Sequence, residues 1–467
     1  MQLWAHQEKA VELAKKHTGF ALFHEMGTGK TKTSVTLLES IFKKEHEILP
    51  TLIIAPLSTL EGWRKELSAS SLLGSQFHIM SGSTTPTRVK RACLDKAKGK
   101  QIFVFNTDSV SVRLFQRFYR EELKPEVLIV DESHLFKTHN SERTKNLSTL
   151  SAGIKYRYIL TGSPMTRSEQ DYWSQINIVA PGKFPTAFHT FKKRFFYDAN
   201  TSMPKHVHFP DWRIQPEKVE EFHKTIASVS HTVKKDEVLD LPPLVKMTEH
   251  VELTPEQKKH YQSLEQDFFT AIEPSDELVT ADVVLTKLLR LRQLCCGVLR
   301  TDVGTDCLVN TQKTVVLKRL VQEIIASGNK VIIWTPFLAT LRPITRLIEE
   351  IGERYIMITG GQALDNRKEL ISAFQRNTNI CVATPKAAGT GTDGLQVASY
   401  MIYFGLDYNW GEDAQSEARA YRGGSEQHEK VTRIDLITRG TIEEEVQQAL
   451  NDKLTKVELA EILRAKA

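Results

Sequence analysis

Two adjacent carboxylates, Asp131 and Glu132, follow a run of apolar residues in the stretch LIVDESHLFKTHNS, with His134 two positions further on. An acidic pair at the end of a buried strand is compatible with a metal centre, a catalytic dyad or a solvated loop. The stretch contains no cysteine that could join His134 in a zinc site. The choice among the three therefore depends on the chemistry that the rest of the chain supplies.

A glycine-rich turn between an apolar run and a helical segment lies upstream, in ALFHEMGTGKTKTSV. Gly27 and Gly29 allow backbone N–H groups to point at phosphate oxygens. Lys30 can reach the β- and γ-phosphates, and the Thr31 hydroxyl can ligate Mg²⁺. The following helix adds the positive end of its dipole. The strict motif GxxxxGK[ST] has glycine where this chain has His24, but the strand before and the helix after favour a nucleotide-binding loop.

The acidic pair gains a role once the phosphate loop is considered. An ATPase with such a loop needs a carboxylate at the end of a neighbouring strand for Mg²⁺, and a second acid to orient and deprotonate the attacking water. We therefore assign Asp131, together with Thr31, to Mg²⁺ and Glu132 to general-base catalysis. We interpret His134 as the residue that couples this site to the rest of its domain. ATP and Mg²⁺ are the expected cofactors.

Short apolar runs alternate with amphipathic, helix-length segments in two parts of the chain, which predicts two α/β units with parallel sheets. Between 165 and 243 we predict no strands, and the prolines of LDLPPL indicate a linker. A helix is predicted to begin after Thr254, with Gln257 completing a capping box. The predicted strands are GFALF, TLIIAP, QIFVF, VLIVDE and YRYILTG in the first part, and KVIIW, YIMITG, NICVAT, YMIYF and VTRIDLIT in the second.

The composition is that of a soluble globular protein: 467 residues, 40% hydrophobic, 25% charged and a formal net charge of +5. No apolar run approaches the ~20 residues of a membrane span, and the N-terminus lacks the features of a secretory signal. We expect a cytoplasmic protein of a bacterium or a phage-infected cell, or a nuclear one in a eukaryote. The scattered cysteines predict reduced thiols and no zinc site. The mild positive charge permits a nucleic-acid partner without requiring one.

Ten segments of the chain, in their order, resemble the motifs of superfamily 2 helicases, and within them the Snf2-like branch of ATP-dependent DNA translocases and helicases. The resemblance covers nearly the whole sequence, including the tryptophan Trp63 in the third segment. The segments are LWAHQ, HEMGTGKT, LIIAPLSTLEGWRKEL, VDESHLFK, LTGSP, LLRLRQLCCG, KVIIWTPF, ATPKAAGTGTDGLQ, QSEARAYRGGSEQ and DLITRGTIEEEV.

The resemblance implies an α/β fold of two RecA-like P-loop domains in tandem, with helical protrusions between them. It also implies that ATP binds between the two domains, and that domain closure and opening convert hydrolysis into motion. The implied boundaries are the first RecA-like lobe over 1–165, its protrusion over 166–240, a linker over 241–252, the protrusion of the second lobe over 253–310, and the second lobe over 311–467.

The resemblance also assigns residues to roles. Arg419 and Arg422, three apart in an expected helix, share a face and can stabilise charge on a transferring phosphoryl group. The implied nucleotide-binding residues are Gln7, Met26, Gly27, Thr28, Gly29, Lys30, Thr31, Asp131, Glu132 and Gly391. The implied DNA-phosphate contacts are Pro56, Ser58, Thr107 and Thr384, and the implied coupling residues are His134, Thr161 and Ser163.

The sequence thus predicts an ATP-dependent DNA motor that grips the DNA backbone largely without regard to base sequence. Duplex, fork or branched DNA are its expected partners, with a role in fork or junction remodelling during replication, recombination or repair. We expect a compact, monomeric motor of the phage or bacterial type, without accessory domains. The alternatives are an RNA helicase, and a nucleotide-switch interaction protein without motor activity.

Overall fold

The computed structural model divides the chain into two compact units, Met1–Leu239 and Asp240–Ala467, here called unit 1 and unit 2. Each unit is built on its own parallel sheet. The structure describes residues 3–452, apart from 58, 81–90, 94, 97, 166–167, 200–211, 239, 273–280, 301–304, 361, 363 and 389–393.

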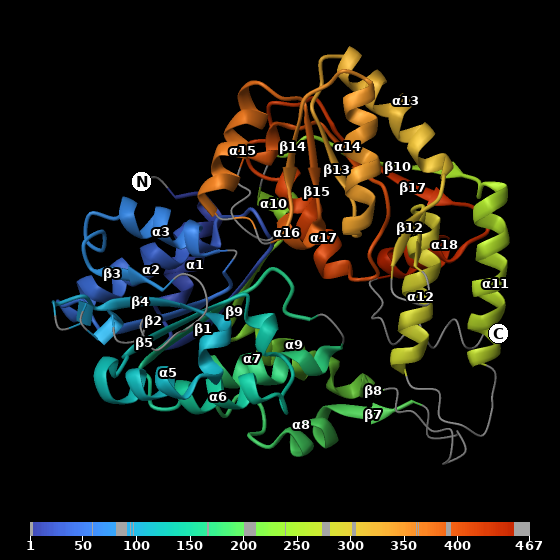
Figure 1. Ribbon diagram of the computed structural model, residues 1–467. Helices are drawn as coiled ribbons and strands as arrows, with labels where there is room; N and C mark the ends of the chain where they lie inside the picture. The colour runs from blue at the N-terminus through green and yellow to red at the C-terminus, as the bar shows by residue number, and fades with distance from the viewer. Residues whose placement is uncertain are drawn as a thin grey trace. The chain divides into compact units, whose positions relative to one another are not determined.

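The sheet of unit 1 has seven strands in the order β3-β4-β2-β5-β6-β1-β9, and all neighbouring strands run parallel (Figure 1). The five strands predicted for this part of the chain are confirmed, and they form its centre. The strands are β1 (Gly19–His24), β2 (Thr51–Ala55), β3 (Phe77–Ile79), β4 (Ile102–Asn106), β5 (Val127–Asp131), β6 (Tyr156–Leu160) and β9 (Ser230–Val233).

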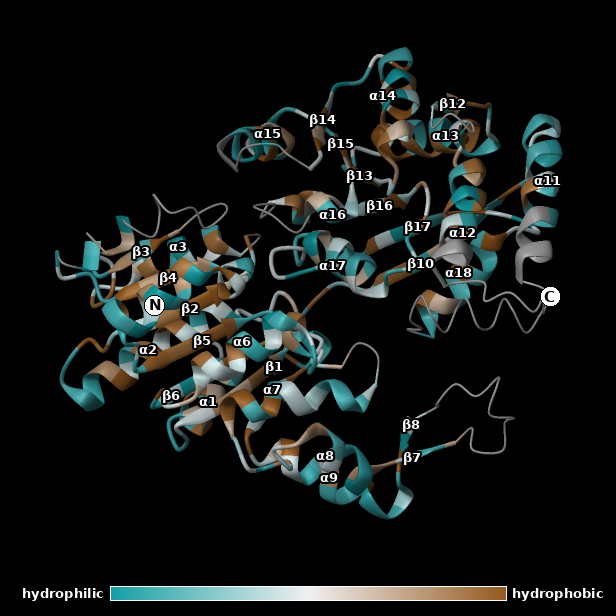
Figure 2. Cartoon of the chain, turned by 60° about the horizontal axis from the view of Figure 1, so that its bottom comes forward, coloured by the Kyte–Doolittle hydropathy of each residue, from teal (hydrophilic) through white to brown (hydrophobic). Residues whose placement is uncertain are grey.

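Helices cover both faces of this sheet, because the central strands are apolar on both sides. Within β2, Leu52 and Ile54 pack against α5, α6 and α7, whereas Ile53 and Ala55 pack against α1, α2 and α3. Figure 1 shows the two groups of helices on opposite sides of the strands, and Figure 2 shows β2 and β5 in the hydrophobic colour. The helices are α1 (Ala5–Ala14), α2 (Lys30–Glu45), α3 (Leu60–Ala69), α5 (Arg113–Arg117), α6 (Glu142–Ser151) and α7 (Tyr172–Val179).

The last part of unit 1 is an aromatic-rich extension of the core. Five phenylalanines, Phe184, Phe191, Phe195, Phe196 and Phe222, pack into the same buried cluster as α5–α7. The prediction of no strands here is wrong, because β7 and β8 form a short antiparallel pair and β9 joins the main sheet. The strands escaped prediction because they have three or four residues and little apolar periodicity. The elements are α8 (Phe188–Phe195), β7 (Phe196–Asp198), β8 (Trp212–Ile214), α9 (Val219–Ala227) and α10 (Lys235–Val238).

The sheet of unit 2 has six strands in the order β10-β17-β16-β13-β15-β14, again entirely parallel. All five strands predicted for the second part are confirmed. The strands are β10 (Leu244–Val251), β13 (Val331–Trp334), β14 (Tyr355–Ile358), β15 (Ile380–Ala383), β16 (Tyr400–Tyr403) and β17 (Val431–Thr438), and a separate antiparallel pair consists of β11 (Val298–Arg300) and β12 (Asp306–Leu308).

Helices α13 and α14 pack on one face of this sheet, and α12 and α15–α18 pack on the other. Helix α11 begins as predicted: the Thr254 backbone N–H donates to Oε1 of Gln257 at 3.1 Å, and the Gln257 N–H donates to Oγ1 of Thr254 at 3.2 Å. The helices are α11 (Pro255–Ile272), α12 (Ala281–Cys295), α13 (Gln312–Ala326), α14 (Leu341–Glu350), α15 (Leu364–Arg376), α16 (Pro385–Ala388), α17 (Trp410–Ala420) and α18 (Ile442–Asn451).

The segment 241–252, interpreted as a linker, contains the strand β10. Over its whole length β10 pairs in parallel with β17, the last strand in the described part of the chain, from Leu244 opposite Val431 to Val251 opposite Thr438. Most of its side chains are exposed, so the strand carries no apolar run, and the two prolines before it indicated a break. Its place in the structure depends on a partner far along the chain.

In the described part of the chain, no helix is long and apolar enough to cross a membrane. Cys93, Cys295, Cys296, Cys307 and Cys381 are all free thiols. Among the described residues, no group of three or more His, Cys, Asp or Glu side chains is arranged to hold a metal ion. His206 and His208, part of a histidine-rich stretch in the sequence, lie outside the described residues.

Candidate functional site

The phosphate loop, the acidic pair and Thr161 are brought together by the order of three strands. Strands β5, β6 and β1 are neighbours in the sheet and run parallel, so their carboxyl ends meet at one edge. The loop Met26–Thr31 follows β1, Glu132 follows β5, and Thr161 follows β6. A Cβ atom added to Gly162 would lie 3.2 Å from the backbone nitrogen of Met26, which shows how closely two of these segments approach.

The phosphate loop is held by its own carbonyl groups. Nζ of Lys30 donates to the carbonyl oxygens of His24 at 2.8 Å and of Glu25 at 3.2 Å. The Thr28 hydroxyl donates to the Glu25 oxygen at 2.7 Å. Gly29 adopts a left-handed φ of 79° at the start of α2, a conformation that favours glycine. The lysine ammonium is therefore placed among hydrogen-bond acceptors at the N-terminus of a helix, where phosphate oxygens bind favourably.

Gln7 contacts the phosphate loop directly. Its Nε2 donates to the carbonyl oxygens of Thr28 at 3.4 Å and of Gly29 at 3.2 Å, and its Oε1 accepts from the Trp4 N–H at 2.9 Å. A side chain at position 29 would collide with it, because a Cβ there would lie 2.2 Å from Nε2 of Gln7. Gln7 of the first helix thus holds the backbone of the loop at Thr28 and Gly29, while its predicted role in binding the nucleotide stays a prediction.

The two carboxylates lie at the end of β5 in a buried environment, Asp131 being 3% and Glu132 7% exposed. Nε1 of Trp63 donates to Oδ2 of Asp131 at 3.0 Å, and the Glu132 N–H donates to Oδ1 at 2.9 Å. Burial, followed by the charge of Glu132, raises the pKa of Asp131, while the donors Trp63 and Thr59 and the charge of Lys30 act in the opposite direction. A buried carboxylate with a raised pKa gains most from a bound cation.

Glu132 adopts a left-handed φ of 49°, which is unusual for a residue with a side chain. The turn that follows places His134 against it: Nδ1 of His134 lies 3.2 Å from Oε2 of Glu132 and 3.0 Å from Oγ1 of Thr161. The same Thr161 hydroxyl accepts from the Ser163 N–H at 3.1 Å. The three residues predicted to couple the site therefore form one connected chain of polar contacts that ends on the acidic pair.

The residues predicted to contact DNA stand after the carboxyl ends of strands. Pro56 follows β2, Thr107 follows β4 and Thr384 follows β15 in unit 2. The side chains of Thr107 and Thr384 are buried. Ser58 and Gly391 lie outside the described residues. The predicted DNA contacts and the nucleotide-binding role of Gly391 all stay predictions.

The prediction that Arg419 and Arg422 share one helix face is wrong. Helix α17 ends at Ala420, and Tyr421 has left the helical conformation with ψ of 85°. Arg419 is therefore the only one of the two on the helix, and Arg422 lies in the bend before Gly423 and Gly424. Two successive glycines favour the end of a helix, a signal that was present in the sequence.

Helix α17 is fixed from β17 by Arg433. The guanidinium donates to both carboxylate oxygens of Asp413 at 2.8 and 2.9 Å, to Glu417 at 3.0 Å and to Asp435 at 2.8 Å. It also stacks 3.9 Å from the centroid of the Tyr403 ring. A buried cation that binds two carboxylates four residues apart defines which face of α17 is turned to the sheet. Sequence reasoning missed Arg433 because its partners on α17, Asp413 and Glu417, stand 20 and 16 residues away in the chain.

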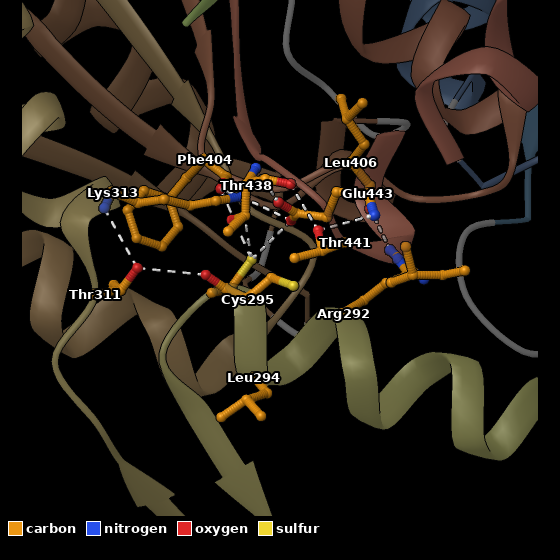
Figure 3. Close-up of polar contacts among 12 residues, drawn as sticks. Arg292, Leu294, Cys295, Thr311, Lys313, Phe404, Leu406, Thr438, Thr441 and Glu443 are labelled. Atoms are coloured by element: carbon orange, nitrogen blue, oxygen red, sulfur yellow. Dashed lines mark hydrogen bonds and ion pairs between the residues drawn. The ribbon is translucent and has the colours of Figure 1, made fainter. Parts of the chain in front are cut away.

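The loop between β16 and α17 is held by two further buried cations, shown in Figure 3. Nζ of Lys313 donates to Glu443 at 2.7 Å and to the Phe404 carbonyl at 3.0 Å. Arg292 of α12 donates to the Leu406 carbonyl. The other oxygen of Glu443 accepts from the Thr438 N–H at 2.9 Å, which links the start of α18 to the end of β17. The helix that carries Arg419 is thus positioned at its start as well as along its face.

The chain has the features of a two-domain P-loop protein. Its first parallel α/β unit has a phosphate loop and an acidic pair at the carboxyl edge of the sheet, and a second parallel α/β unit follows in tandem. Residues 6–298 match the family model of the SNF2-related domain, and residues 312–424 match that of the helicase conserved C-terminal domain. The chain belongs to the SNF2-related family.

The chain is similar to proteins of both eukaryotes and bacteria. The chain is 27% identical to the CHD3-type chromatin-remodeling factor PICKLE of Arabidopsis thaliana, over 94% of this chain and 32% of that protein. It is also 27% identical to an uncharacterized ATP-dependent helicase of Mycoplasma pneumoniae, over 94% of this chain and 40% of the relative. The chain therefore spans well under half the length of both relatives.

Among solved structures, the Sulfolobus solfataricus SWI2/SNF2 ATPase core in complex with dsDNA is 25% identical to this chain. The match covers 100% of this chain and 93% of the other, with a TM-score of 0.44.

Proposed function

We propose that this chain is an ATP-dependent DNA translocase or helicase that couples ATP hydrolysis to movement along DNA. The observation that carries the proposal is the arrangement of side chains in unit 1: Lys30 lies in the phosphate loop after β1, Asp131 and Glu132 lie at the carboxyl end of β5 in the same sheet, and His134 contacts both Glu132 and Thr161. Membership of the SNF2-related family supports the same activity.

The donors at the site fit Mg²⁺, which prefers hard oxygen ligands and is usually held by one or two carboxylates together with substrate phosphates. The Thr31 hydroxyl and the Asp131 carboxylate would hold it, and the buried Asp131 carboxylate has a raised pKa that a cation would offset. When bound, the metal supplies positive charge beside the β- and γ-phosphate oxygens.

The side chains of the site would then act in sequence. Lys30 exchanges the carbonyls of His24 and Glu25 for phosphate oxygens, which places its charge on the transferred group. Glu132 orients the attacking water and accepts its proton. Arg419 and Arg422 stabilise the charge that develops on the phosphoryl group. His134 contacts both Glu132 and Thr161, so a change in the position or protonation of Glu132 affects Thr161. The segment that contains Thr161 is proposed to be coupled to the DNA-binding surface.

The proposed partner is DNA contacted through its phosphates by Pro56, Ser58, Thr107 and Thr384, so binding should depend little on base sequence. We further propose a monomeric motor that acts on forks or branched junctions, in the cytoplasm of a bacterium or phage-infected cell or in the nucleus of a eukaryote. Light scattering of the purified chain with and without DNA tests the oligomeric state.

The decisive experiment measures ATP hydrolysis and strand displacement on duplex, fork, four-way junction, single-stranded DNA and RNA. Hydrolysis stimulated by DNA, and lost in Lys30→Ala and Glu132→Gln, is expected. Lys43→Ala, at the exposed far end of α2, and Glu126→Gln, at the opposite end of β5, are the matched controls. Stimulation by RNA alone would favour an RNA helicase. Equal hydrolysis with and without nucleic acid, or binding without hydrolysis, would favour a nucleotide switch over a motor.

A further inference from the structure

His24, the departure from the strict phosphate-loop motif, is paired with a second histidine. Its ring is fully buried, and its Nε2 lies 3.0 Å from Nδ1 of His231. The two rings meet edge to face, with centroids 5.1 Å apart and planes inclined at 73°. In such a contact one imidazole donates and the other accepts, so the pair shares one proton. Burial, then the neighbouring His231 and Lys30, lowers the pKa of His24 to about 2, and burial lowers the pKa of His231 as well.

The partner histidine lies on β9, the strand that follows the aromatic extension of unit 1. Strand β9 pairs with β1 up to His24 opposite Val233. Two hydrogen bonds extend the contact beyond the strand: the Glu25 N–H donates to the Val233 carbonyl at 2.9 Å, and the Lys235 N–H donates to the side-chain Oε2 of Glu25 at 3.0 Å. Because unit 1 ends at Leu239, this is the segment through which the chain leaves the unit.

The same two residues, His24 and Glu25, hold the phosphate loop from the other side. Their carbonyl oxygens accept from Nζ of Lys30, and the Glu25 carbonyl accepts from the Thr28 hydroxyl as well. Their side chains therefore contact the exit segment, and their backbone carbonyl groups contact the loop. If Lys30 forms other hydrogen bonds, the carbonyl groups of His24 and Glu25 lose its ammonium as a donor. These are the two residues to which the exit segment is attached.

We propose that His231 is a positioning residue for the phosphate loop: its hydrogen bond to His24, with the contact of Lys235 to Glu25, ties the loop to the segment through which the chain leaves unit 1. The inference rests on the proposed binding of ATP by this loop. When Lys30 leaves the carbonyl groups of His24 and Glu25 to bind phosphate, these two residues shift, and their contacts with His231 and Lys235 transmit the shift to the exit segment. The side chain at position 24 then takes part in coupling the phosphate loop to the exit segment, whereas a glycine at this position would only allow the loop to turn.

The test compares three substitutions on β9. His231→Ala removes the partner of a buried ring, whereas His231→Asn keeps an amide close to the position of Nδ1 and can preserve the hydrogen bond. Thr232→Ala is the matched control, since Thr232 is exposed and adjacent to His231 on the same strand. For each protein we would measure KM and kcat with and without duplex DNA, binding of a fluorescent ATP analogue, and thermal unfolding.

His231→Ala is expected to raise KM for ATP about fivefold to tenfold, in line with the loss of a hydrogen bond to a buried group, and to lower the DNA stimulation of kcat. His231→Asn and Thr232→Ala should both resemble the wild type. If His231→Ala does not fold, Glu25→Ala against Glu25→Gln tests the second contact of the tie, because glutamine retains an oxygen acceptor for the Lys235 N–H.

The outcomes separate this inference from the proposed function. A wild-type chain that neither binds nor hydrolyses ATP would overturn both. An active wild type in which His231→Ala behaves like Thr232→Ala would overturn the inference and leave the proposed function intact. An equal defect in His231→Ala and His231→Asn would also overturn it, because the effect would then follow the loss of the ring and would not follow the hydrogen bond.

Discussion

Replacing Trp63 by phenylalanine removes one hydrogen-bond donor from the proposed metal ligand and leaves most of the ring in place. Trp63 is fully buried on α3, and its Nε1 lies 3.0 Å from Oδ2 of Asp131. A hydrogen bond to a charged acceptor contributes about 1.5–3 kcal/mol. We therefore expect Trp63→Phe to lower the free energy of unfolding by about 2 kcal/mol while Asp131 is ionised.

The loss should depend on pH in a defined direction. The pKa of Asp131 is raised in the folded chain, and the Trp63 donor is one of the groups that lower it, so the substitution raises it further. A carboxyl group with a raised pKa costs stability as the pH rises above its unfolded value. The difference between wild type and Trp63→Phe should therefore be small near pH 4 and fully developed once Asp131 is ionised.

Urea unfolding across this pH range measures the effect, and Trp173→Phe is its control. The Trp173 indole donates to the carbonyl oxygen of Pro185, a neutral acceptor, at 2.8 Å. Its loss should cost about 1 kcal/mol at every pH. The Mg²⁺ concentration for half-maximal ATPase activity should rise in Trp63→Phe alone. Equal, pH-independent losses in the two variants would refute a charge-assisted bond to Asp131.

Three further outcomes follow from polar contacts within the two units. His134→Ala should retain ATP binding and lose most of the DNA stimulation of ATPase activity, because it removes the contact from Glu132 to Thr161; full stimulation would remove the coupling role. Lys313→Met should cost about 3–5 kcal/mol in urea unfolding, because Glu443 is left buried without its cation, and Glu443→Gln added to it should recover part of the loss; a single-variant loss under about 1 kcal/mol would contradict this. His24 has an ordinary pKa of 6.5 and a folded pKa of about 2, so its contribution to stability is complete above pH 6.5 and falls by about 1.4 kcal/mol per pH unit below it. In His24→Asn the free energy of unfolding should lose this part of its pH dependence. An unchanged pH profile would contradict the lowered pKa of His24.

The centres of both sheets could be predicted because their strands are buried on both faces and read as short, continuous apolar runs. The strand β10 could not, because it lies at the edge of its sheet and its exposed side chains follow no apolar pattern. Its pairing is specified by β17, at the other end of the unit. Local sequence thus predicted the strands whose burial is symmetrical and missed those whose position depends on a distant partner.

The candidate site shows the same division. The phosphate loop and the acidic pair could be predicted because the functional residues of each are contiguous in the sequence. The order of β5, β6 and β1 brings the two motifs to the same edge of the sheet. By contrast, the partner of His24 stands 207 residues away in the chain, and that of Asp131 stands 68 residues away at Trp63. No spacing rule relates such pairs, since only the folded sheet makes them neighbours. Arg422 was misplaced for a local reason, because the glycines after it end the helix.

The pairing of β10 with β17 has a consequence for how the protein is made. Strand β10 ends at Val251 and its partner begins at Val431, so at about 5–20 residues per second the ribosome needs roughly 10–40 s to supply the partner. During that interval the polar backbone groups of β10 are available to other chains, whereas unit 1 has already received its last strand, β9. Translation therefore supplies the described strands of unit 1 first, and the sheet of unit 2 stays incomplete until β17 has been made. A nascent chain stalled between these points should be the species that chaperones bind and that aggregates in their absence.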